Sequence, residues 1–514
     1  MGKPTNLLSA ILDALPLGIR SYPEAVGVTA GEILYLCVEP EKTFSVAFYF
    51  QGLTENLSPA PTPVPLVQDL RWVSRNGAIF TSFSVASSQK PDLDWNWPRI
   101  GFAIPSTWPS GVYFAIVYPV DPQTGLATDD LGTAVQTGDP QHKLKPHPDL
   151  SVTPAVAWDH GMALFVVRPT PAQASSGTVK IAYMLSVSTY QAYNNTGPGC
   201  FYYDTTSVTR VTLRRPGGGV GSPIMEAEAD FLDTASMRGT YAHWDAKFIR
   251  WLARQNIACH FYTNYDLDGF LPRQPNPLIS NAGQPVYPLL LSVGHDEYWS
   301  AAIRAAITAY QRQNGNVAIF SGNTCYRPVS FGAPSTSTSK YDPPPTSIPA
   351  DKKSIIIKLA DKWPDDNNEA RTIGVTWRNG LGSWSPTFRR SNTGYTWQND
   401  WIIQGGRDFG AALCVVGYEA DGKFPGQSPS NYTVIADASF PGGDPWDIPG
   451  QGSYGQAHMG YFQLNTAAPA GKSTLFNAAT TDWSRLLPLT DSVTDPDMLF
   501  VQTVTQAIIN YLAS

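Results

Sequence analysis

The sequence has little charge, no basic cluster and no long apolar run. Only 15% of its 514 residues are charged, and the formal net charge is −7. It has no dense lysine or arginine tract, and such tracts are what nucleic acids and anionic membranes attract. No segment approaches the roughly 18 consecutive apolar residues of a membrane-spanning helix. We therefore expect neither nucleic acid nor a membrane as a partner.

Cysteine is also scarce. The chain has five widely spaced cysteines and no CxxC motif: Cys37, Cys200, Cys259, Cys325 and Cys414. Neither a disulfide framework nor a zinc knuckle is indicated. The N-terminal stretch has only a broken apolar patch before Pro16 and lacks a signal-peptide core and cleavage box. A cytoplasmic location is the expectation.

Glycine and proline, by contrast, are abundant. The chain has 43 Gly and 44 Pro, together about a sixth of all residues against a usual share of about 12%. This favours many turns and short strands. After a tail at residues 1–17, residues 18–172 contain short β-branched and aromatic runs bounded by turn residues: "EILYLCVEP", "FSVAFYFQG", "AIFTSFSVA", "RIGFAIP", "GVYFAIVYP" and "MALFVVRP". The spacing predicts an all-β domain, a sandwich of immunoglobulin type.

The pattern changes to α/β over residues 173–514. "KIAYMLSVST" reads as a strand buried on both faces, and "TYAHWDAKFIRWLARQN" as a helix. "YPLLLSVG" and "NVAIFSG" read as strands joined by a helix with Ser300 as its N-cap. "AALCVVGYE" and "STLFNAATTDW" are expected to supply later strands, and "PDMLFVQTVTQAIINYLA" a closing helix. This alternation predicts a mostly parallel sheet, and the low-complexity stretch 332–353 is expected to be a surface loop or lid.

Chemically active side chains concentrate where two of these strands end. The run "LLLSVGHDEYWS" places Glu297 just past one strand, and "NVAIFSGNTCY" places Asn323 just past the next. In open α/β sheets, ligands bind beyond the carboxyl ends of the strands. The pattern therefore predicts a site at this edge.

A thiol nucleophile is one candidate chemistry. Cys325 with His295 on the neighbouring strand end, on a doubly wound sheet, would resemble class I glutamine amidotransferases. The strand-to-helix elbow G-x-C-x-G is absent, however. A single cysteine beside an aromatic residue is more often a small buried hydrophobe, so this interpretation is an alternative.

Metal binding is the other candidate. No H-E-x-x-H motif occurs and the seven histidines are scattered, which disfavours a histidine-rich zinc site. Oxygen donors are plentiful, because "STYQAYNNTGPGCFYYD" concentrates four tyrosines after a buried strand: Tyr190, Tyr193, Tyr202 and Tyr203. From composition alone, aromatic packing at a domain interface is the better explanation of them.

Further polar or aromatic positions near strand ends are weaker candidates: Asp266, Asp268, Glu419, His458, Asp482 and Trp483. The two aspartates of "NYDLDG" indicate a strand-end turn first. The glutamate of "VVGYEADG" is placed to line a pocket. The histidine of "GQAHMGYF" is expected in a loop, and "TTDW" is expected to anchor the last helix.

Several of these stretches together resemble one known family. "SVGHDEYWS", "SGNTCY", "TYQAYNN", "YYD" before "RRP", "HWDAKFIRWLARQNI", "YDLDG" and "FNAATTDWSRLL" are similar to the catalytic subunit of N,N-dimethylformamidase and its relatives. "DWNWPRIGFAIPSTWPSGVYFAIV" resembles the end of that family's N-terminal β domain. The resemblance runs from about residue 20 to the end of the chain, and it is densest over 180–326 and 470–514.

The resemblance implies a mononuclear ferric site, Fe(III), held by two tyrosines and one glutamate. The ligands carry over to Glu297, to Tyr193 (with Tyr190 as the alternative) and to Tyr203, while His295 and Asn323 match the family's nearby histidine and asparagine. The family's Gly-Gly-Asn turn reads Ser321-Gly322-Asn323 here. Independently, Fe(III) is a hard ion that prefers anionic oxygen.

The resemblance further implies an iron-dependent amidohydrolase that cleaves the C–N bond of a small N-substituted amide with metal-activated water. Its partners would be the amide substrate and a small second subunit or a homo-oligomer. Two alternatives remain at this stage. One is a non-catalytic carbohydrate- or surface-binding protein with a relic α/β domain. The other is the thiol-dependent amide hydrolase using Cys325 and His295.

Overall fold

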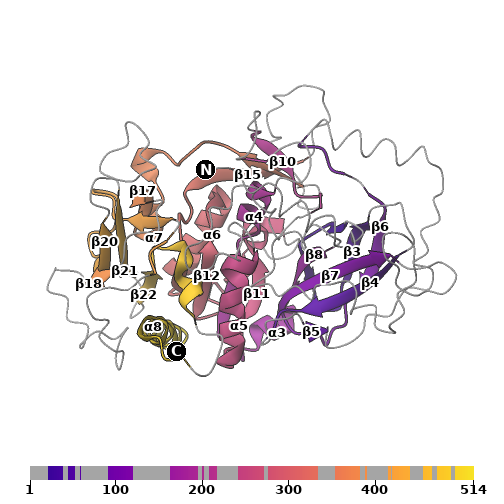
Figure 1. Cartoon of the computed structure of the whole chain (residues 1–514), viewed down its shortest axis with the longest axis horizontal. Coiled ribbons are helices and arrows are strands. Elements are labelled where there is room, and N and C mark those ends of the chain that lie inside the picture. Colours follow the sequence, from indigo (N-terminus) through magenta and orange to yellow (C-terminus); the bar gives the residue numbers. More distant parts are fainter. Residues whose placement is uncertain are drawn as a thin grey trace, which may run out of the picture. The chain divides into compact units, whose positions relative to one another are not determined.

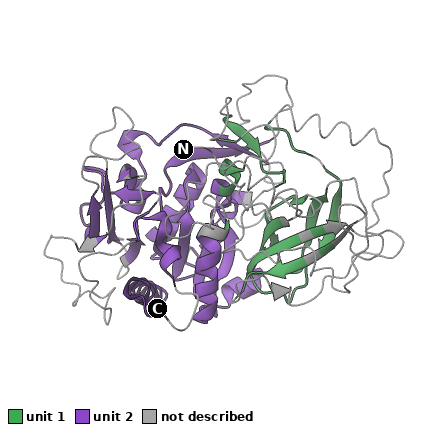
Figure 2. Ribbon diagram, viewed as in Figure 1, with its two compact units in different colours: residues 1–168, 190–243, 334–343 green, residues 169–189, 244–333, 344–514 purple. Residues whose placement is uncertain are grey.

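The computed structural model describes most, but not all, of the chain. The described ranges are residues 21–38, 44–52, 58–59, 91–95, 97–119, 162–194, 200–201, 208–216, 241–270, 276–333, 354–381, 388–390, 415–417, 419–439, 455–465, 472–487 and 493–514. They fall into two compact units (Figure 2). Unit 1 lies within residues 1–168, 190–243 and 334–343, and unit 2 within 169–189, 244–333 and 344–514. Each unit is described by itself.

Unit 1 is built around two β-sheets. The five-stranded sheet has the order β2-β8-β7-β4-β5, formed by Gly27–Thr29, Met162–Arg168, Gly111–Pro119, Phe44–Phe50 and Ser58–Pro59. The three-stranded sheet has the order β1-β3-β6, formed by Ser21–Pro23, Ile33–Val38 and Arg99–Ala103. Apart from the parallel pair β2 and β8, the neighbouring strands run antiparallel. A short strand, β10 (Arg210–Thr212), also belongs to this unit.

The two sheets of unit 1 share one apolar core. Alternate residues of β3, β7 and β8 point into it, as the two-residue period of a strand requires. The Trp108 ring stacks on Tyr113 with centroids 4.6 Å apart, and Phe48 meets Phe102 and Phe165 edge-on. The predicted β content is therefore present. The run "AIFTSFSVA" at 78–86 lies outside the described residues.

Unit 2 centres on an eight-stranded sheet with the order β11-β9-β12-β14-β22-β21-β20-β18. Its strands are His260–Thr263, Ile181–Leu185, Leu289–His295, Asn316–Gly322, Lys472–Asn477, Gln456–Asn465, Thr433–Ser439 and Arg389–Arg390. The first five run parallel, but β21, β20 and β18 join antiparallel. The prediction of a mostly parallel sheet thus holds for the central strands and is wrong for this extension. Antiparallel neighbours do not need the crossover connection that parallel strands require.

Among the helices of unit 2, α5, α6 and α8 contact strands of this sheet (Figure 1). Their bounds are α3 Pro171–Ser175, α5 Lys247–Arg254, α6 Ala301–Arg312, α7 Ala370–Ile373 and α8 Pro496–Leu512, while α4 (Val187–Tyr193) follows β9 across the unit boundary. Shorter turns are η3 Ala242–Ala246, η4 Asp266–Phe270, η6 Asp365–Asn367 and η8 Thr481–Leu486. The Phe248 ring of α5 contacts Tyr183 of β9 and Phe320 of β14. Among the described helices, none combines the length and apolar character needed to cross a membrane.

Helix α6 starts where the sequence predicted. The Ser300 hydroxyl accepts a hydrogen bond from the Ile303 N–H at 3.1 Å, as an N-cap does. The same hydroxyl donates to Asp268. On its apolar face, Ile303, Ile307 and Tyr310 are all buried, which fixes the helix between β12 and β14.

Two small sheets complete unit 2. Strand β15 (Arg327–Gly332) pairs with β13 (Tyr298–Ser300) in parallel and with β16 (Ile355–Lys358) antiparallel. Strand β17 (Thr376–Leu381) pairs with β19 (Ala420–Gly422). Strand β13 follows β12 and strand β15 follows β14 in the chain, so their pairing lies just past the carboxyl ends of β12 and β14.

The expected strand in "AALCVVGYE" is wrong in its described part. Residues 415–417 form no strand, and β19 begins only at Ala420. Side chains from the other end of the chain satisfy this backbone instead of a sheet ladder. The Thr480 hydroxyl accepts from Gly417 N–H at 3.1 Å and donates to Val415 C=O at 3.0 Å, and the Thr481 hydroxyl donates to Gly417 C=O at 2.9 Å.

Strand β14 ends at a point of close backbone approach. A Cβ on Gly322 would lie 2.4 Å from the Glu419 carbonyl oxygen and 2.7 Å from the Thr481 nitrogen. Thr481 N–H in turn donates to Glu419 C=O at 3.0 Å. Three distant segments therefore meet at this glycine, and any side chain here displaces main chain.

Ser300→Ala tests the cap of α6. Loss of the N-cap oxygen should lower the free energy of unfolding by about 1 kcal/mol, measured by chemical denaturation. Thr308→Ala is the control, because the Thr308 hydroxyl only donates back to Arg304 C=O within the same helix and its loss should change stability by less than about 0.5 kcal/mol. Equal effects of the two substitutions would count against the cap.

Gly322→Ala tests the crowded end of β14. Since the new methyl meets main-chain atoms, the free energy of unfolding should fall by about 3 kcal/mol. Gly177→Ala is the matched control, because Gly177 has φ +67° but no atom within 4 Å of the added Cβ. Backbone strain alone should cost about 1 to 2 kcal/mol there. A Gly322 variant no less stable than the Gly177 variant contradicts the crowding.

Candidate functional site

The site lies where the order of the parallel strands reverses. From β9 the chain passes to β11 on one side, then returns to β12 on the other side and continues to β14. The carboxyl ends of β9 and β12 thus flank the switch point at which such sheets bind ligands. Hydrogen bonds join the two ends: Glu297 N–H donates to Thr189 Oγ1 at 3.0 Å, and Ser188 Oγ donates to Tyr298 C=O at 2.8 Å.

A glycine sets the direction of the chain as it leaves β12. Gly294 has φ +76°, and a Cβ there would lie 2.3 Å from the Trp244 Cβ. This left-handed conformation is accessible to glycine at little cost. With no side chain at 294, Trp244 approaches the main chain and its ring meets His295 at 5.9 Å between centroids.

His295 is fully buried between two carboxylates. Its Nε2 lies 3.0 Å from Glu419 Oε2 and 3.6 Å from Glu297 Oε2, and its Nδ1 lies 3.3 Å from the Gly322 carbonyl oxygen. Burial lowers the pKa of His295, but the charge and hydrogen bond of Glu419, with Glu297, outweigh it and raise the pKa to about 9. The raised pKa favours the protonated ring, in which both nitrogens carry a proton, and Nδ1 faces the Gly322 carbonyl oxygen.

Glu297 is only 1% exposed and is held by a cation. Arg327 Nε donates to Glu297 Oε1 at 2.7 Å, and the Arg327 backbone N–H donates to Glu297 C=O at 3.0 Å. The other carboxylate oxygen, Oε2, faces His295. Because a buried carboxylate is costly unless paired, this arginine explains how Glu297 is accommodated.

The turn after β14 is held by the buried carboxylate of Asp421. Asn323 and Cys325 have φ of +50° and +59°, unusual for residues other than glycine. Asp421 accepts from the Asn323 N–H at 2.9 Å and the Thr324 N–H at 3.4 Å. Burial raises the pKa of Asp421 to about 8 although the two amides lower it. Asn323 Oδ1 is buried and has no hydrogen-bond partner among the described residues, so it remains available to a ligand.

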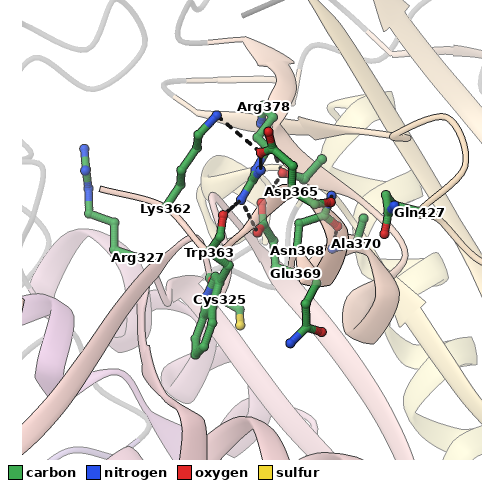
Figure 3. A network of polar contacts seen from close by, with 12 residues as sticks. Cys325, Arg327, Lys362, Trp363, Asp365, Asn368, Glu369, Ala370, Arg378 and Gln427 are labelled. Atoms are coloured by element: carbon green, nitrogen blue, oxygen red, sulfur yellow. Dashed lines mark hydrogen bonds and ion pairs between the residues drawn. The ribbon is translucent and has the colours of Figure 1, made fainter. Parts of the chain in front are cut away.

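Cys325 is not placed as a nucleophile. Its side chain is fully buried, and burial raises the pKa of its thiol well above the usual value, whereas a reactive cysteine needs a lowered one. Figure 3 shows it beside the Trp363 indole, whose Nε1–H donates to Cys325 C=O at 2.6 Å. Arg378 holds the Trp363 carbonyl and Asp365 and pairs with Glu369 at 3.5 Å. This network keeps the segment after β16 against the turn.

The weaker candidates are mostly structural. Asp266 Oδ2 accepts from the Thr263 N–H at 2.8 Å, the strand-end turn that was predicted. Trp483 Nε1–H donates to Thr505 Oγ1 of α8 at 2.8 Å, so "TTDW" anchors the last helix. The loop prediction for His458 is wrong, because it lies in β21. There its Nδ1 accepts from the Lys423 N–H at 3.0 Å, and burial lowers its pKa to about 4.

The tyrosines are only partly placed. Tyr190 and Tyr193 lie on α4 and are buried, whereas Tyr202 and Tyr203 lie outside the described residues. Within the described ranges, no group of three or more His, Cys, Asp or Glu is arranged to hold a metal ion. The ligand set expected from the resemblance differs from such a group because two of its three donors are tyrosines.

The structure thus brings His295, Glu297 and the Asn323 turn together, as the strand-end pattern predicted. It adds Glu419 as a direct neighbour of His295, which the sequence offered only as a weak candidate. Sequence reasoning missed Arg327 and Asp421 altogether. A basic residue four positions after Asn323 was a visible signal for the former, since a buried glutamate needs a cation, but the chain offered no local signal for Asp421.

No curated protein matches the chain significantly. A family model does match: the one described as N,N-dimethylformamidase beta subunit-like, C-terminal, aligns with residues 69–495. This range covers most of the 514 residues and includes His295, Glu297, Asn323 and Glu419. The chain is therefore a member of the N,N-dimethylformamidase beta subunit-like family.

Proposed function

We propose that the protein is an iron-dependent amidohydrolase that cleaves the C–N bond of a small N-substituted amide resembling N,N-dimethylformamide. One observation carries the proposal. A fully buried histidine lies between two carboxylates at the switch point of the sheet, in a chain whose family is described by that activity. Buried, closely spaced charges of this kind are costly to a fold and are concentrated in active sites.

The donor set suits a ferric ion. We propose Glu297, Tyr193 and Tyr203 as its ligands. Two phenolates and one carboxylate carry three negative charges and are hard oxygen donors, which Fe(III) prefers. Glu297 meets this requirement as a buried carboxylate.

Tyr193 is the first tyrosine that we propose, with Tyr190 as the alternative, because "TYQAY" matches the family's T-Y-x-A-Y element. Tyr203 remains a ligand by family resemblance.

When bound, the ferric ion supplies Lewis-acid activation of water and of the amide carbonyl. The protein supplies the proton transfer. His295 Nε2 lies within hydrogen-bonding distance of Glu419, while Nδ1–H holds the Gly322 carbonyl and fixes the ring. We propose that Nε2–H protonates the leaving amine nitrogen, a step typically worth about 10²- to 10⁴-fold in rate.

Asn323 orients the substrate or the attacking water. Its Oδ1 is buried without a partner among the described residues, and Asp421 fixes its backbone. The side-chain amide is thus presented on a rigid turn, as a positioning group requires. With dimethylformamide as substrate, the products would be formate and dimethylamine.

The family description also bears on assembly. A chain resembling a beta subunit suggests an enzyme with more than one kind of subunit. We propose that this chain works with a small second subunit, with a homo-oligomer as the alternative. Co-purification with that subunit or the mass of the purified particle distinguishes the two.

Glu297→Ala should abolish both metal binding and activity. Elemental analysis of the wild-type protein should find about one iron per chain, and a screen of small formamides and acetamides should detect amine release. The variant should contain less than about a tenth of that iron, since a three-residue site has lost a charged ligand. Glu24→Ala is the control, because the Glu24 carboxylate forms its ion pair with the exposed Arg99.

A wild-type protein that folds without iron and releases no amine contradicts the proposal. That outcome would favour the non-catalytic binding protein instead.

Cys325→Ala should leave amide hydrolysis within about threefold of wild type, because the buried thiol is neutral and takes no part in the chemistry. Removing one small buried side chain should still lower the free energy of unfolding by about 1 kcal/mol. Amine release is measured on protein with equal iron content. Loss of more than about 100-fold would favour the thiol-dependent hydrolase, since removal of a nucleophile costs at least that much.

A further inference from the structure

Arg327 binds Glu297 in a specific geometry. Its Nε–H, rather than the terminal nitrogens of the guanidinium, donates to Glu297 Oε1 at 2.7 Å. The strand pairing of β13 with β15 sets this geometry, because Arg327 is directly opposite Tyr298, the residue after Glu297. Its backbone N–H also donates to Glu297 C=O. Arg327 is therefore fixed to Glu297 through both main chain and side chain.

The far end of the Arg327 side chain is fixed as well. Nη1 donates to the Asp361 carbonyl oxygen at 3.0 Å and lies 3.4 Å from Asp361 Oδ1. Asp361 pairs with Lys358 Nζ at 2.6 Å. Two residues further on, Trp363 bonds the Cys325 carbonyl and is held by Arg378 (Figure 3). The guanidinium thus has hydrogen-bond partners at both Nε and Nη1.

We propose that Arg327 is a positioning residue that holds Oε1 of Glu297 and presents Oε2 as the oxygen through which Glu297 binds the metal ion. This inference rests on the iron site proposed above. Oε2 lies on the His295 side of the carboxylate, 3.6 Å from His295 Nε2. A carboxylate whose Oε1 is held by a strong hydrogen bond binds a cation through one oxygen and leaves more positions on the ion for water and substrate.

The charge of Arg327 and its hydrogen bond to Glu297 have opposite effects on iron affinity. A guanidinium beside the site repels a trivalent cation, so removal of the charge alone would strengthen iron binding. Loss of the hydrogen bond frees the carboxylate and weakens binding, typically by about 10- to 100-fold for a residue that supports a metal ligand. A pair of neutral variants separates the two effects.

Arg327→Gln and Arg327→Met form that pair. In glutamine, Nε2 is bonded to Cδ and occupies the place of the arginine Nε, so the bond to Glu297 Oε1 is kept while the charge and the Asp361 contact are lost. In methionine, a methyl group occupies that place and the bond is lost too. Both variants have the same charge and similar length.

Iron affinity of the full-length protein is measured by competition with a chelator, starting from Fe(III) nitrilotriacetate. The glutamine variant, which keeps the bond and loses the charge, should bind iron as tightly as wild type or up to about threefold more tightly, and the methionine variant should bind it about 10- to 100-fold more weakly than wild type. Arg99→Met is the control: Arg99 also pairs with a carboxylate, Glu24, at 2.8 Å, and its loss should not change iron affinity. Unfolding of the metal-free variants reports any general loss of stability.

Equal iron affinity of the two Arg327 variants would overturn the inference, as would a methionine variant as tight as wild type. If the methionine variant does not fold, Arg327→Lys replaces it. Lysine keeps the charge but places a carbon where Nε was, so its affinity should fall below that of the glutamine variant. A wild-type protein that binds no iron, or a Glu297→Ala variant that binds it fully, defeats the proposed function instead, so the two failures are distinguishable.

Discussion

The site depends on the in-register parallel pairing of β12 with β14. This pairing places His295 opposite Gly322, so that the residues following both strands emerge at one edge. The carboxylate of Glu297 and the turn at Asn323 are then neighbours because of the strand pairing. Because side chains alternate along a strand, a one-residue slip of either strand would turn each of its side chains to the opposite face of the sheet. The register of this pair therefore decides which residues meet at the site.

Burial makes this edge an unusual environment. Glu297, Glu419 and His295 are almost without solvent, where an isolated charge is very costly. Here each charged side chain has a neighbour of opposite charge. His295 lies between the two carboxylates, and Arg327 binds Oε1 of Glu297. Breaking one partner from such a set leaves the others uncompensated. The site is thus a single electrostatic unit, and its members are not independent positions.

Much of this arrangement could be predicted from the sequence, because it depends on signals between residues close together in the chain. The continuous apolar run before His295, the Ser300 cap and the helical spacing after it are short-range signals, and each gave the observed element. The antiparallel extension of the sheet was not readable, because β21 and β22 carry no pattern that distinguishes a hairpin partner from a crossover strand. Glu419 and Asp421 were underestimated or missed for a related reason: their partners are about 100 residues away in the chain. The proposal of Tyr193 and Tyr203 as ligands rests on family resemblance.

Thr480 and Thr481 form hydrogen bonds to residues 415–417 and to Glu419, and these bonds affect the order in which the site is completed. The segment that delivers Glu419 is fastened by hydroxyls about 60 residues further along the chain, so this part of the site is completed only after Thr480 and Thr481 have been added. Contacts between residues so far apart in the sequence form late, because closing a large loop costs chain entropy before the contact is made. A chain synthesised only as far as β14 would therefore contain His295 without Glu419, one of its two acidic neighbours.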